Sequence, residues 1–301
     1  MALVVAALGG NALLRRGQPM EVAVQRQNVA VAVQALAELE RDNELVVTHG
    51  NGPQVGLLAL QAEAYSGAPA PPLDVLGAES EGMIGYLLEQ GLHGRTRRPP
   101  AALLTTVRVD RDDPAFGSPS KPIGPIYERA AAERLRDERG WAIAADGEHW
   151  RRVVASPEPR EIVELATIRR LLEAQTLVIC AGGGGIPVVA DAHGGLHGVE
   201  AVIDKDLAAA LLADALGADV LLLLTDVDSV VRAYGTDEAQ PIGEVPAGQL
   251  DPDDFAAGSM RPKVMAAARF ASRPGRMAGI GALADAAAIV AGERGTRVVA
   301  S

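Results

Sequence analysis

Three lysines are the first residues in this sequence whose type points to chemistry. The chain has 28 basic residues, of which only Lys121, Lys205 and Lys263 are lysines and the other 25 are arginines. Lysine carries a compact ammonium, and the wide, planar guanidinium of arginine does not replace it at a crowded anionic centre. Each lysine also lies among glycine, proline or aspartate residues. We therefore expect all three to contact an anionic ligand rather than to be ordinary surface lysines.

Glycine-rich turns follow three short apolar segments that resemble strands. They are Gly9-Gly10-Asn11, Gly50-Asn51-Gly52 and the run from Gly182 to Gly185, which includes Gly183 and Gly184. Glycine lets backbone amides approach a phosphate closely, and the N-terminus of a following helix adds a favourable dipole. A single tight turn would need glycine without any ligand. Three such turns favour a phosphate site, because the carboxyl ends of parallel strands meet at one edge of a sheet.

The second half of the chain adds charged side chains to this pattern. Asp204-Lys205-Asp206 follows an apolar stretch and opens an alanine-rich helical segment. Here Lys205 could lie against a transferring phosphoryl group while Asp206 holds cationic groups in place; a solvated charged surface is the alternative. Thr225-Asp226-Val227 follows the most apolar segment, and Gly258 to Lys263 opens another helix. The Walker sequence, the protein-kinase motifs and the dinucleotide fingerprint are absent, so the phosphates must be bound in another way.

These residues need a framework, and alternating apolar segments and helical patterns predict an α/β fold with a mostly parallel sheet covered on both faces. Apolar residues recur at helical spacing around Val22 to Leu36 and Ile162 to Leu172, and a third helix is predicted over 204–216 with Asp204 as its N-cap. The predicted strands are continuously apolar, which indicates burial on both faces. They are Leu3–Leu8, Glu44–Thr48, Ala101–Val107, Thr176–Cys180, Val220–Leu224 and Arg297–Val299.

One segment, residues 110–154, interrupts this alternation. It holds four prolines, both tryptophans and a charged stretch, and it includes Lys121. We predict a lid or small protruding subdomain inserted into a single domain that spans residues 1–301.

Composition excludes several classes of protein. The net charge of −11 argues against binding to nucleic acid or to an anionic membrane, and no apolar run approaches the ~20 residues that a membrane span requires. Cys180 is the single cysteine, so an intrachain disulfide and a cysteine-based zinc site are excluded. The sequence predicts a cytoplasmic protein.

In these motifs, and over nearly the whole chain, the sequence resembles the carbamate kinases within the amino acid kinase family. Lys121 in Lys-Pro-Ile-Gly-Pro is the feature that distinguishes carbamate kinases from their relatives, which usually place a lysine at the end of the first strand, where this chain has Ala7-Leu8. The other segments that carry the resemblance are Ala7 to Ala12, His49 to Gly56, Gly82 to Tyr86, Gly182 to Val188, Gly198 to Asp206, Thr225 to Val227 and Gly258 to Lys263.

The resemblance implies a three-layer α/β/α sandwich, usually a homodimer, that transfers a phosphoryl group between carbamoyl phosphate and ADP to give ATP and carbamate, with Mg²⁺. A catabolic, ATP-forming role is implied as well, and the resemblance assigns no direct metal ligands. It also implies roles for individual residues. The catalytic set would be Lys121, Lys205, Asp206 and Lys263; Gly9, Gly10, Asn11, Gly50, Asn51 and Gly52 would cradle carbamoyl phosphate; and Gly183, Gly184, Asp226, Val227, Tyr234 and Met260 would bind the nucleotide.

The residues agree with this chemistry. Carbamate is already an anion, so phosphoryl transfer needs positioning and charge neutralisation but no catalytic base. We accordingly expect His49 to hold the adjacent loop by hydrogen bonding. Two residues depart from the family pattern: Arg261 replaces a glycine beside Lys263, and Glu81 replaces a glutamine. Two alternatives are an amino acid kinase acting on another small carboxylate and a non-catalytic nucleotide sensor.

Overall fold

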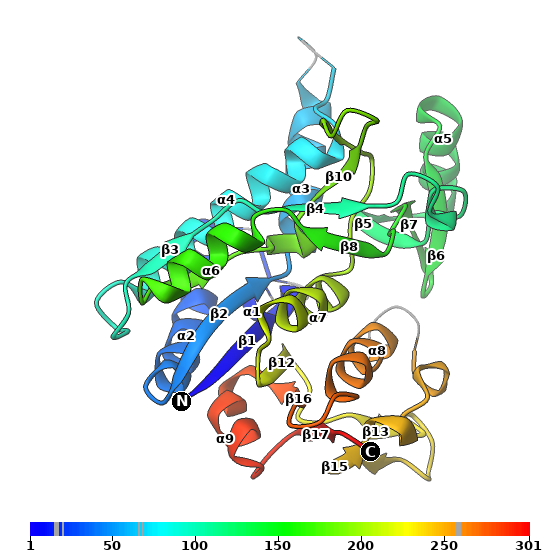
Figure 1. The fold of residues 1–301 in the computed structure, drawn as a ribbon. Coiled ribbons are helices and arrows are strands. Elements are labelled where there is room, and N and C mark those ends of the chain that lie inside the picture. Colours follow the sequence, from blue (N-terminus) through cyan, green and yellow to red (C-terminus); the bar gives the residue numbers. More distant parts are fainter. Residues whose placement is uncertain (15–17, 20, 66, 68, 257–259) are drawn as a thin grey trace.

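An eight-stranded sheet forms the centre of the protein in the computed structural model, which describes residues 1–14, 18–19, 21–65, 67, 69–256 and 260–301 (Figure 1). Most neighbouring strands are parallel, whereas β17 runs antiparallel to β16. The mostly parallel sheet predicted from the sequence is thus confirmed. In order, the strands are β15 (Glu244–Pro246), β17 (Thr296–Val299), β16 (Met277–Ala282), β12 (Val220–Thr225), β1 (Ala2–Leu8), β2 (Asn43–His49), β9 (Leu177–Ile179) and β3 (Pro100–Ala102).

Helices cover both faces of this sheet. Val5 and Ala7 of β1 pack into the core cluster on one face, and Val4, Ala6 and Leu8 pack into the cluster on the other. Both sides of the strand are therefore buried, as its continuous apolarity predicts. The first face is covered by α6 (Leu165–Glu173), α7 (Lys205–Leu216) and α8 (Met260–Ala271), and the second by α1 (Gly10–Leu13), α2 (Val22–Glu40), α4 (Leu73–Leu92) and α9 (Ala286–Ala291).

A second, four-stranded sheet extends the domain beyond β9. Its strands, in order, are β11 (Leu196–Gly198), β10 (Ile186–Ala190), β4 (Thr106–Val109) and β8 (Pro159–Ile162). The single strand predicted over Ala101–Val107 is therefore wrong: the segment is divided between β3 and β4, which belong to different sheets. Thr105 lies at the division, where its hydroxyl accepts a hydrogen bond from the Ala181 amide. Ile162 likewise belongs to β8, so the helix predicted to include it begins later.

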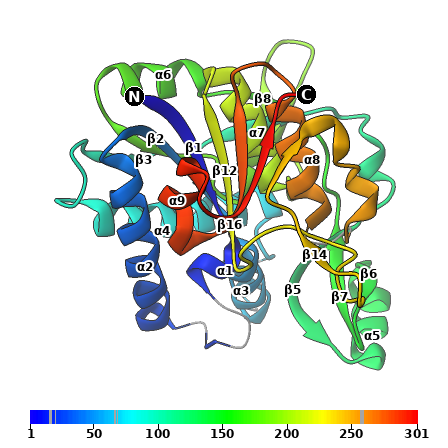
Figure 2. The ribbon, with the colours of Figure 1, turned by 90° about the horizontal axis from the view of Figure 1, so that it is seen from below.

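The segment that interrupts the alternation forms a small sheet of its own, β5 (Lys121–Tyr127), β7 (His149–Val154) and β6 (Ala142–Asp146), together with helix α5 (Arg129–Arg139). This unit protrudes from one side of the domain (Figures 1 and 2). Its strand β5 packs against α3 (Gly52–Ala64). Arg139 and Arg152 lie over the ring of Trp141, with guanidinium-to-centroid distances of 5.2 and 4.9 Å. We call β5, α5, β6 and β7 the lid unit.

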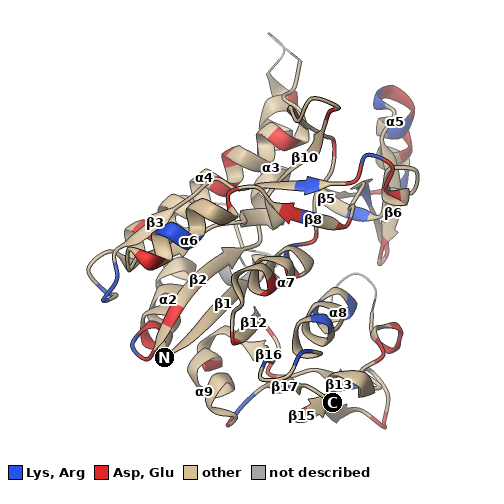
Figure 3. Ribbon diagram, viewed as in Figure 1, with Lys and Arg blue, Asp and Glu red and all other residues tan. Residues whose placement is uncertain are grey.

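Charged residues of both signs are spread over the outer helices and loops, and α5 carries both (Figure 3). Two very short strands, β13 (Val231–Arg232) and β14 (Gln240–Pro241), pair with each other. Among the described residues, no helix is both long and apolar enough to cross a bilayer.

Candidate active site

A cavity of about 280 Å³ lies where the central strands end. Strands β1, β2, β9 and β12 are parallel neighbours, so the loops that follow them lie at the same edge of the sheet. The cavity brings together residues that are far apart in the sequence, including all three lysines. Its lining includes Gly9, Gly10, Gly50, Asn51, Gly52, Lys121, Gly183, Asp204, Lys205, Asp206, Asp226 and Lys263.

The start of α7 fixes the central charged residues. Asp204 is the N-cap of the helix, as the sequence predicts, and one oxygen of its carboxylate accepts hydrogen bonds from the Asp206 and Leu207 amides at 2.9 and 3.4 Å. The first turn of α7 is thereby held with Lys205 and Asp206 at the cavity wall. The other face of this helix packs alanine and leucine side chains into the core.

Asp206 binds two lysine ammonium groups, one on each carboxylate oxygen. Lys205 Nζ lies 2.5 Å from Oδ1 and Lys263 Nζ lies 3.1 Å from Oδ2. Burial opposes the ionisation of Asp206, but the two ammonium groups outweigh it and hold its pKa below the usual range. Burial also lowers the pKa of Lys205, an effect that Asp206 opposes. Asp206 therefore stays ionised and holds the two lysines side by side.

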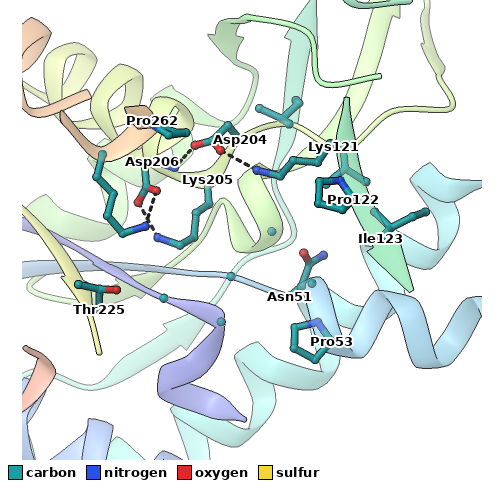
Figure 4. A pocket seen from close by; sticks show the side chains of 18 of the residues that line it. Asn51, Pro53, Lys121, Pro122, Ile123, Asp204, Lys205, Asp206, Thr225 and Pro262 are labelled. Atoms are coloured by element: carbon teal, nitrogen blue, oxygen red, sulfur yellow. Dashed lines mark hydrogen bonds and ion pairs between the residues drawn. The ribbon is translucent and has the colours of Figure 1, made fainter. Parts of the chain in front are cut away.

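Lys121 reaches the same cavity from the lid unit. Its ammonium lies 2.6 Å from Asp204 Oδ2, so the two oxygens of Asp204 serve different partners, the α7 backbone and the lid lysine. Figure 4 shows Lys121 extending from β5 towards Asp204, with Asn51 of the Gly50-Asn51-Gly52 loop and Pro53 at the start of α3 on another side of the cavity. The lid unit and the start of α7 thus meet through an ion pair inside the cavity.

Backbone hydrogen bonds hold the glycine loops. The Gly9 amide donates to the Leu224 carbonyl at 2.8 Å, and the Gly50 amide donates to the Leu8 carbonyl at 2.9 Å. Gly183 has a left-handed conformation (φ = +68°), and a Cβ there would lie 2.2 Å from Asn51 Nδ2. A side chain here would displace the Asn51 amide that contacts Gly183, and the left-handed backbone conformation itself favours glycine.

The N-termini of three long helices point at the cavity. Gly52 begins α3 and Lys205 begins α7, while Pro262 and Lys263 lie in the first turn of α8; all four residues line the cavity. Helix N-termini carry partial positive charge and unpaired amides, which favour an anion. The cavity therefore combines three ammonium groups, helix dipoles and glycine backbone, which suits a chain of phosphates.

Five of the predicted site residues are not among the described residues that line this cavity. Gly184 packs against the Ile203 backbone, and Met260 begins α8 against the core. Val227 and Tyr234 follow β12 and are 38% and 85% exposed. The backbone of Asn11 lies in α1, and its side chain lies outside the described part of the chain. Their predicted roles in binding carbamoyl phosphate or nucleotide remain predictions.

The structure also places the residues on which the sequence was ambiguous. His49 is buried, and its Nδ1 lies 3.2 Å from the Gly50 carbonyl, the kind of loop contact predicted for it. Burial lowers the pKa of His49 to about 4. The Arg261 guanidinium lies near Phe255 and Asp253, whereas Lys263 reaches Asp206. Arg261 thus leaves Lys263 in place.

Sequence reasoning missed the second role of Asp204. The residue was identified as a helix cap, but a cap uses only part of the carboxylate, and the partner of its remaining oxygen lies 83 residues away, on β5 of the lid unit. It also missed Ser80, whose hydroxyl accepts a hydrogen bond from Asn51 Nδ2 at 2.8 Å. Ser80 directly precedes Glu81, which departs from the family pattern. That departure was the feature of the sequence that could have drawn attention to Ser80.

Comparisons with known proteins give a consistent result. The sequence model of the amino acid kinase family matches residues 2–280. Carbamate kinase from Haemophilus influenzae is 52% identical over 297 residues, which are 98% of this chain and 96% of that protein. Carbamate kinase from Rhizobium meliloti is 53% identical over 302 residues, which are 99% of this chain and 93% of that protein.

Solved structures agree. Carbamate kinase from Giardia lamblia bound to citric acid superposes with a TM-score of 0.93 at 39% identity, covering 100% of this chain and 99% of that one. The same protein bound to AMP-PNP gives a TM-score of 0.91 at 39% identity with the same coverage. With the family model spanning most of the sequence and relatives about half identical over nearly their full length, the chain belongs to the amino acid kinase family and, within it, to the carbamate kinases.

Proposed function

We propose that this chain transfers a phosphoryl group reversibly between carbamoyl phosphate and ADP, giving ATP and carbamate. One observation carries the proposal: three lysines and a carboxylate that orders two of them surround one cavity whose walls are glycine loops and helix N-termini. The relatives at 52 and 53% identity are carbamate kinases, which supports the same reaction.

The reaction needs little covalent help from the protein. In the ATP-forming direction a β-phosphate oxygen of ADP attacks the phosphorus of carbamoyl phosphate, and the bond to the carbamate oxygen breaks with its electron pair. Both the attacking and the leaving oxygens are anionic, so no proton must be removed. What remains is alignment and neutralisation of charge on the transferred group. Lys205 and Lys263, held by Asp206, are suited to that task.

Substrate positions follow from the walls of the cavity. We place carbamoyl phosphate against the loops at Gly9-Gly10 and Gly50-Asn51-Gly52, with Lys121 above it. The nucleotide phosphates would approach from the side of Asp226 and Lys263, with Gly183 between the two substrates. In this arrangement carbamoyl phosphate would compete with Asp204 for the ammonium of Lys121, so substrate binding would release that ion pair.

Mg²⁺ is part of the proposed reaction as a companion of the nucleotide. Among the described residues, no group of three histidine, cysteine or acidic side chains could hold a metal ion. Mg²⁺ commonly keeps several waters and binds through substrate phosphates, so it would be held chiefly by ADP or ATP and would offset their charge. Chelation with EDTA should then abolish ATP formation, and added Mg²⁺ should restore it.

We also propose that the protein is a homodimer in the cytoplasm. Edge strand β3 has one neighbour in its sheet, and Tyr86 of α4 and Leu104 beyond β3 are 55 and 51% exposed. An exposed apolar surface beside an edge strand suits a second copy of the chain. Analytical ultracentrifugation should give about twice the mass of the chain, and Tyr86→Glu should shift the protein towards monomer; a monomeric wild-type protein contradicts the proposal.

The decisive test of function is ATP formation from carbamoyl phosphate and ADP, followed by coupled luciferase detection. Wild-type protein should form ATP, and Lys205→Ala should be inactive or nearly so while keeping its thermal unfolding transition. Acetyl phosphate and other acyl phosphates serve as competing substrates. Faster ATP formation from any of these would contradict the substrate assignment, and no ATP from any of them would contradict the reaction.

A further inference from the structure

Helix α4 passes behind two of the glycine loops and contacts both through consecutive residues. Ser80 accepts a hydrogen bond from Asn51 Nδ2 at 2.8 Å, which holds the Gly50-Asn51-Gly52 loop. Glu81 accepts a hydrogen bond from the Gly182 amide through Oε1 at 2.8 Å and another from the Thr105 amide through Oε2 at 3.3 Å. One turn of α4 thus contacts both loops and sets the distance between them, and these loops form one wall of the cavity.

The contact at Gly182 is tight. A Cβ at this position would lie 2.4 Å from His49 Nε2 and 2.8 Å from Glu81 Cγ. The loop therefore lies directly on the side chains of His49 and Glu81, and any displacement of the Glu81 carboxyl group is passed to Gly182 and to its neighbour Gly183. Gly183 in turn lines the cavity and packs on Asn51.

The surroundings of Glu81 offer no counter-charge. Its side chain is buried, and among the described residues no lysine or arginine forms an ion pair with it. Burial raises the pKa of Glu81 to about 8, against the effect of the two backbone amides. The titratable groups that face it or share its small cavity are His49 of β2, Cys180 after β9, Glu164 before α6, and Tyr86 and Glu89 of its own helix.

We propose that Glu81 is a positioning residue that holds the Gly182–Gly184 loop in its anion-binding position as a neutral carboxylic acid, and that its ionisation weakens the binding of the anionic substrates. A neutral carboxyl group presents its carbonyl oxygen to the Gly182 amide and its hydroxyl oxygen, which can still accept a hydrogen bond, to the Thr105 amide. The glutamine common in the family would match it at Gly182 alone. The carboxylate adds an unpaired negative charge directly behind a loop that has to bind phosphates. The inference rests on the proposed phosphoryl transfer at this cavity.

The test compares wild-type protein with Glu81→Gln across pH 7 to 9.5. At pH 7 the two should have KM values for ADP and carbamoyl phosphate within about 2-fold of each other. At pH 9 the KM of the wild type should exceed that of the variant by at least ~3-fold, because a buried charge near the site acts through a low effective dielectric. Taking the ratio at each pH cancels titration of the substrates themselves.

Two matched variants separate charge from packing. Glu89→Gln removes a carboxylate from the same helix and the same small cavity, and should keep the pH profile of the wild type. Ser80→Ala removes the hydrogen bond to the other loop, and should lower activity by the same factor at every pH. A purely structural role for Glu81 would move kcat or stability without changing the ratio of pH profiles.

A direct measurement keeps the inference testable if Glu81→Gln does not fold. Calorimetric titration of the wild-type protein with ADP should show Kd rising at least ~3-fold between pH 7 and pH 9. A flat Kd, or identical profiles for wild type and Glu81→Gln, overturns the inference while leaving the proposed function intact. Absence of ATP formation at every pH would instead overturn the proposed function.

Discussion

Replacing Lys205 by arginine keeps the charge at the centre of the site and changes only its shape. Lys205 Nζ lies 2.5 Å from one oxygen of Asp206, while Lys263 Nζ lies 3.1 Å from the other. Both lysine side chains are nearly buried, with 13 and 12% of their surface exposed. A guanidinium prefers to bind both oxygens of a carboxylate at once. Arginine at position 205 should therefore displace Lys263 from Asp206 and misdirect two cations together.

The expected loss of turnover for Lys205→Arg can be given an upper and a lower bound. Removing a single electrostatic contact to the transition state lowers turnover ~10²–10³-fold, which is the expectation for Lys205→Ala. Lys205→Arg retains the charge but loses its position, so we expect a fall of at least ~10-fold, equivalent to about 1.4 kcal/mol in the activation free energy. Because Lys205 is nearly buried, solvent screening offers little compensation for the misplacement.

The assay is steady-state ATP formation, with ADP binding by calorimetry and thermal unfolding as controls. Arg273→Lys is the control, because it makes the opposite exchange in an exposed ion pair. Arg273 is 60% exposed and pairs with Asp214, so the variant should keep its turnover unchanged. Near-normal turnover of Lys205→Arg would refute the argument, since it would show that Lys205 contributes only diffuse positive charge. It would also remove the significance given to the scarcity of lysine in the sequence.

Further predictions concern His49, the lid unit and Arg261. Because burial lowers the pKa of His49 to about 4, the unfolded state binds more protons between about pH 6.5 and pH 4, so the free energy of unfolding should fall by about 3 kcal/mol as the pH drops through this window. Urea unfolding of wild type and His49→Gln should show this difference; parallel curves would contradict it. Carbamoyl phosphate should protect residues 110–154 from hydrogen exchange, and Lys121→Ala should raise KM for carbamoyl phosphate far more than Kd for ADP; protection of the glycine loops alone would exclude closure. Arg261→Gly should keep turnover within about 2-fold, because Arg261 contacts Phe255 and Asp253, while a large loss would show that it orients Lys263.

The central sheet was predictable because its strands are apolar without interruption. Burial on both faces leaves no polar residue in β1 or in the middle of β12, so these strands stand out in the sequence. β16 was missed because two of its six residues are glycine, where Ile289 packs closely against the backbone. Because the Ile289 side chain supplies the apolar contacts at these two glycines, the sequence of β16 itself shows only weak hydrophobicity.

The residue types that form the candidate site could also be predicted from the sequence, but the contacts between them could not. The lysines, the aspartate between them and the glycine loops have types that few structural roles require, so they could be identified one at a time. The pairings among them could not, because Lys121 lies on β5 and Asp204 at the start of α7, and the two meet only after the lid unit is in place. The contact between Glu81 and Gly182 joins residues 101 positions apart and carries no local signal either.

The gathering of every lysine into one cavity has a consequence for covalent chemistry. Amine-selective reagents find three lysine side chains in this sequence, and all three face the same cavity. Acylation of any lysine, by a laboratory ester or by a reactive metabolite, would therefore fall on the proposed reaction centre. Burial disfavours the charged form of Lys205, which raises the fraction of nucleophilic free amine there, although the same burial limits the access of bulky reagents. A protein so poor in lysine can be labelled at its candidate active site without mutagenesis, and mass spectrometry of the modified peptides would report occupancy of that site directly.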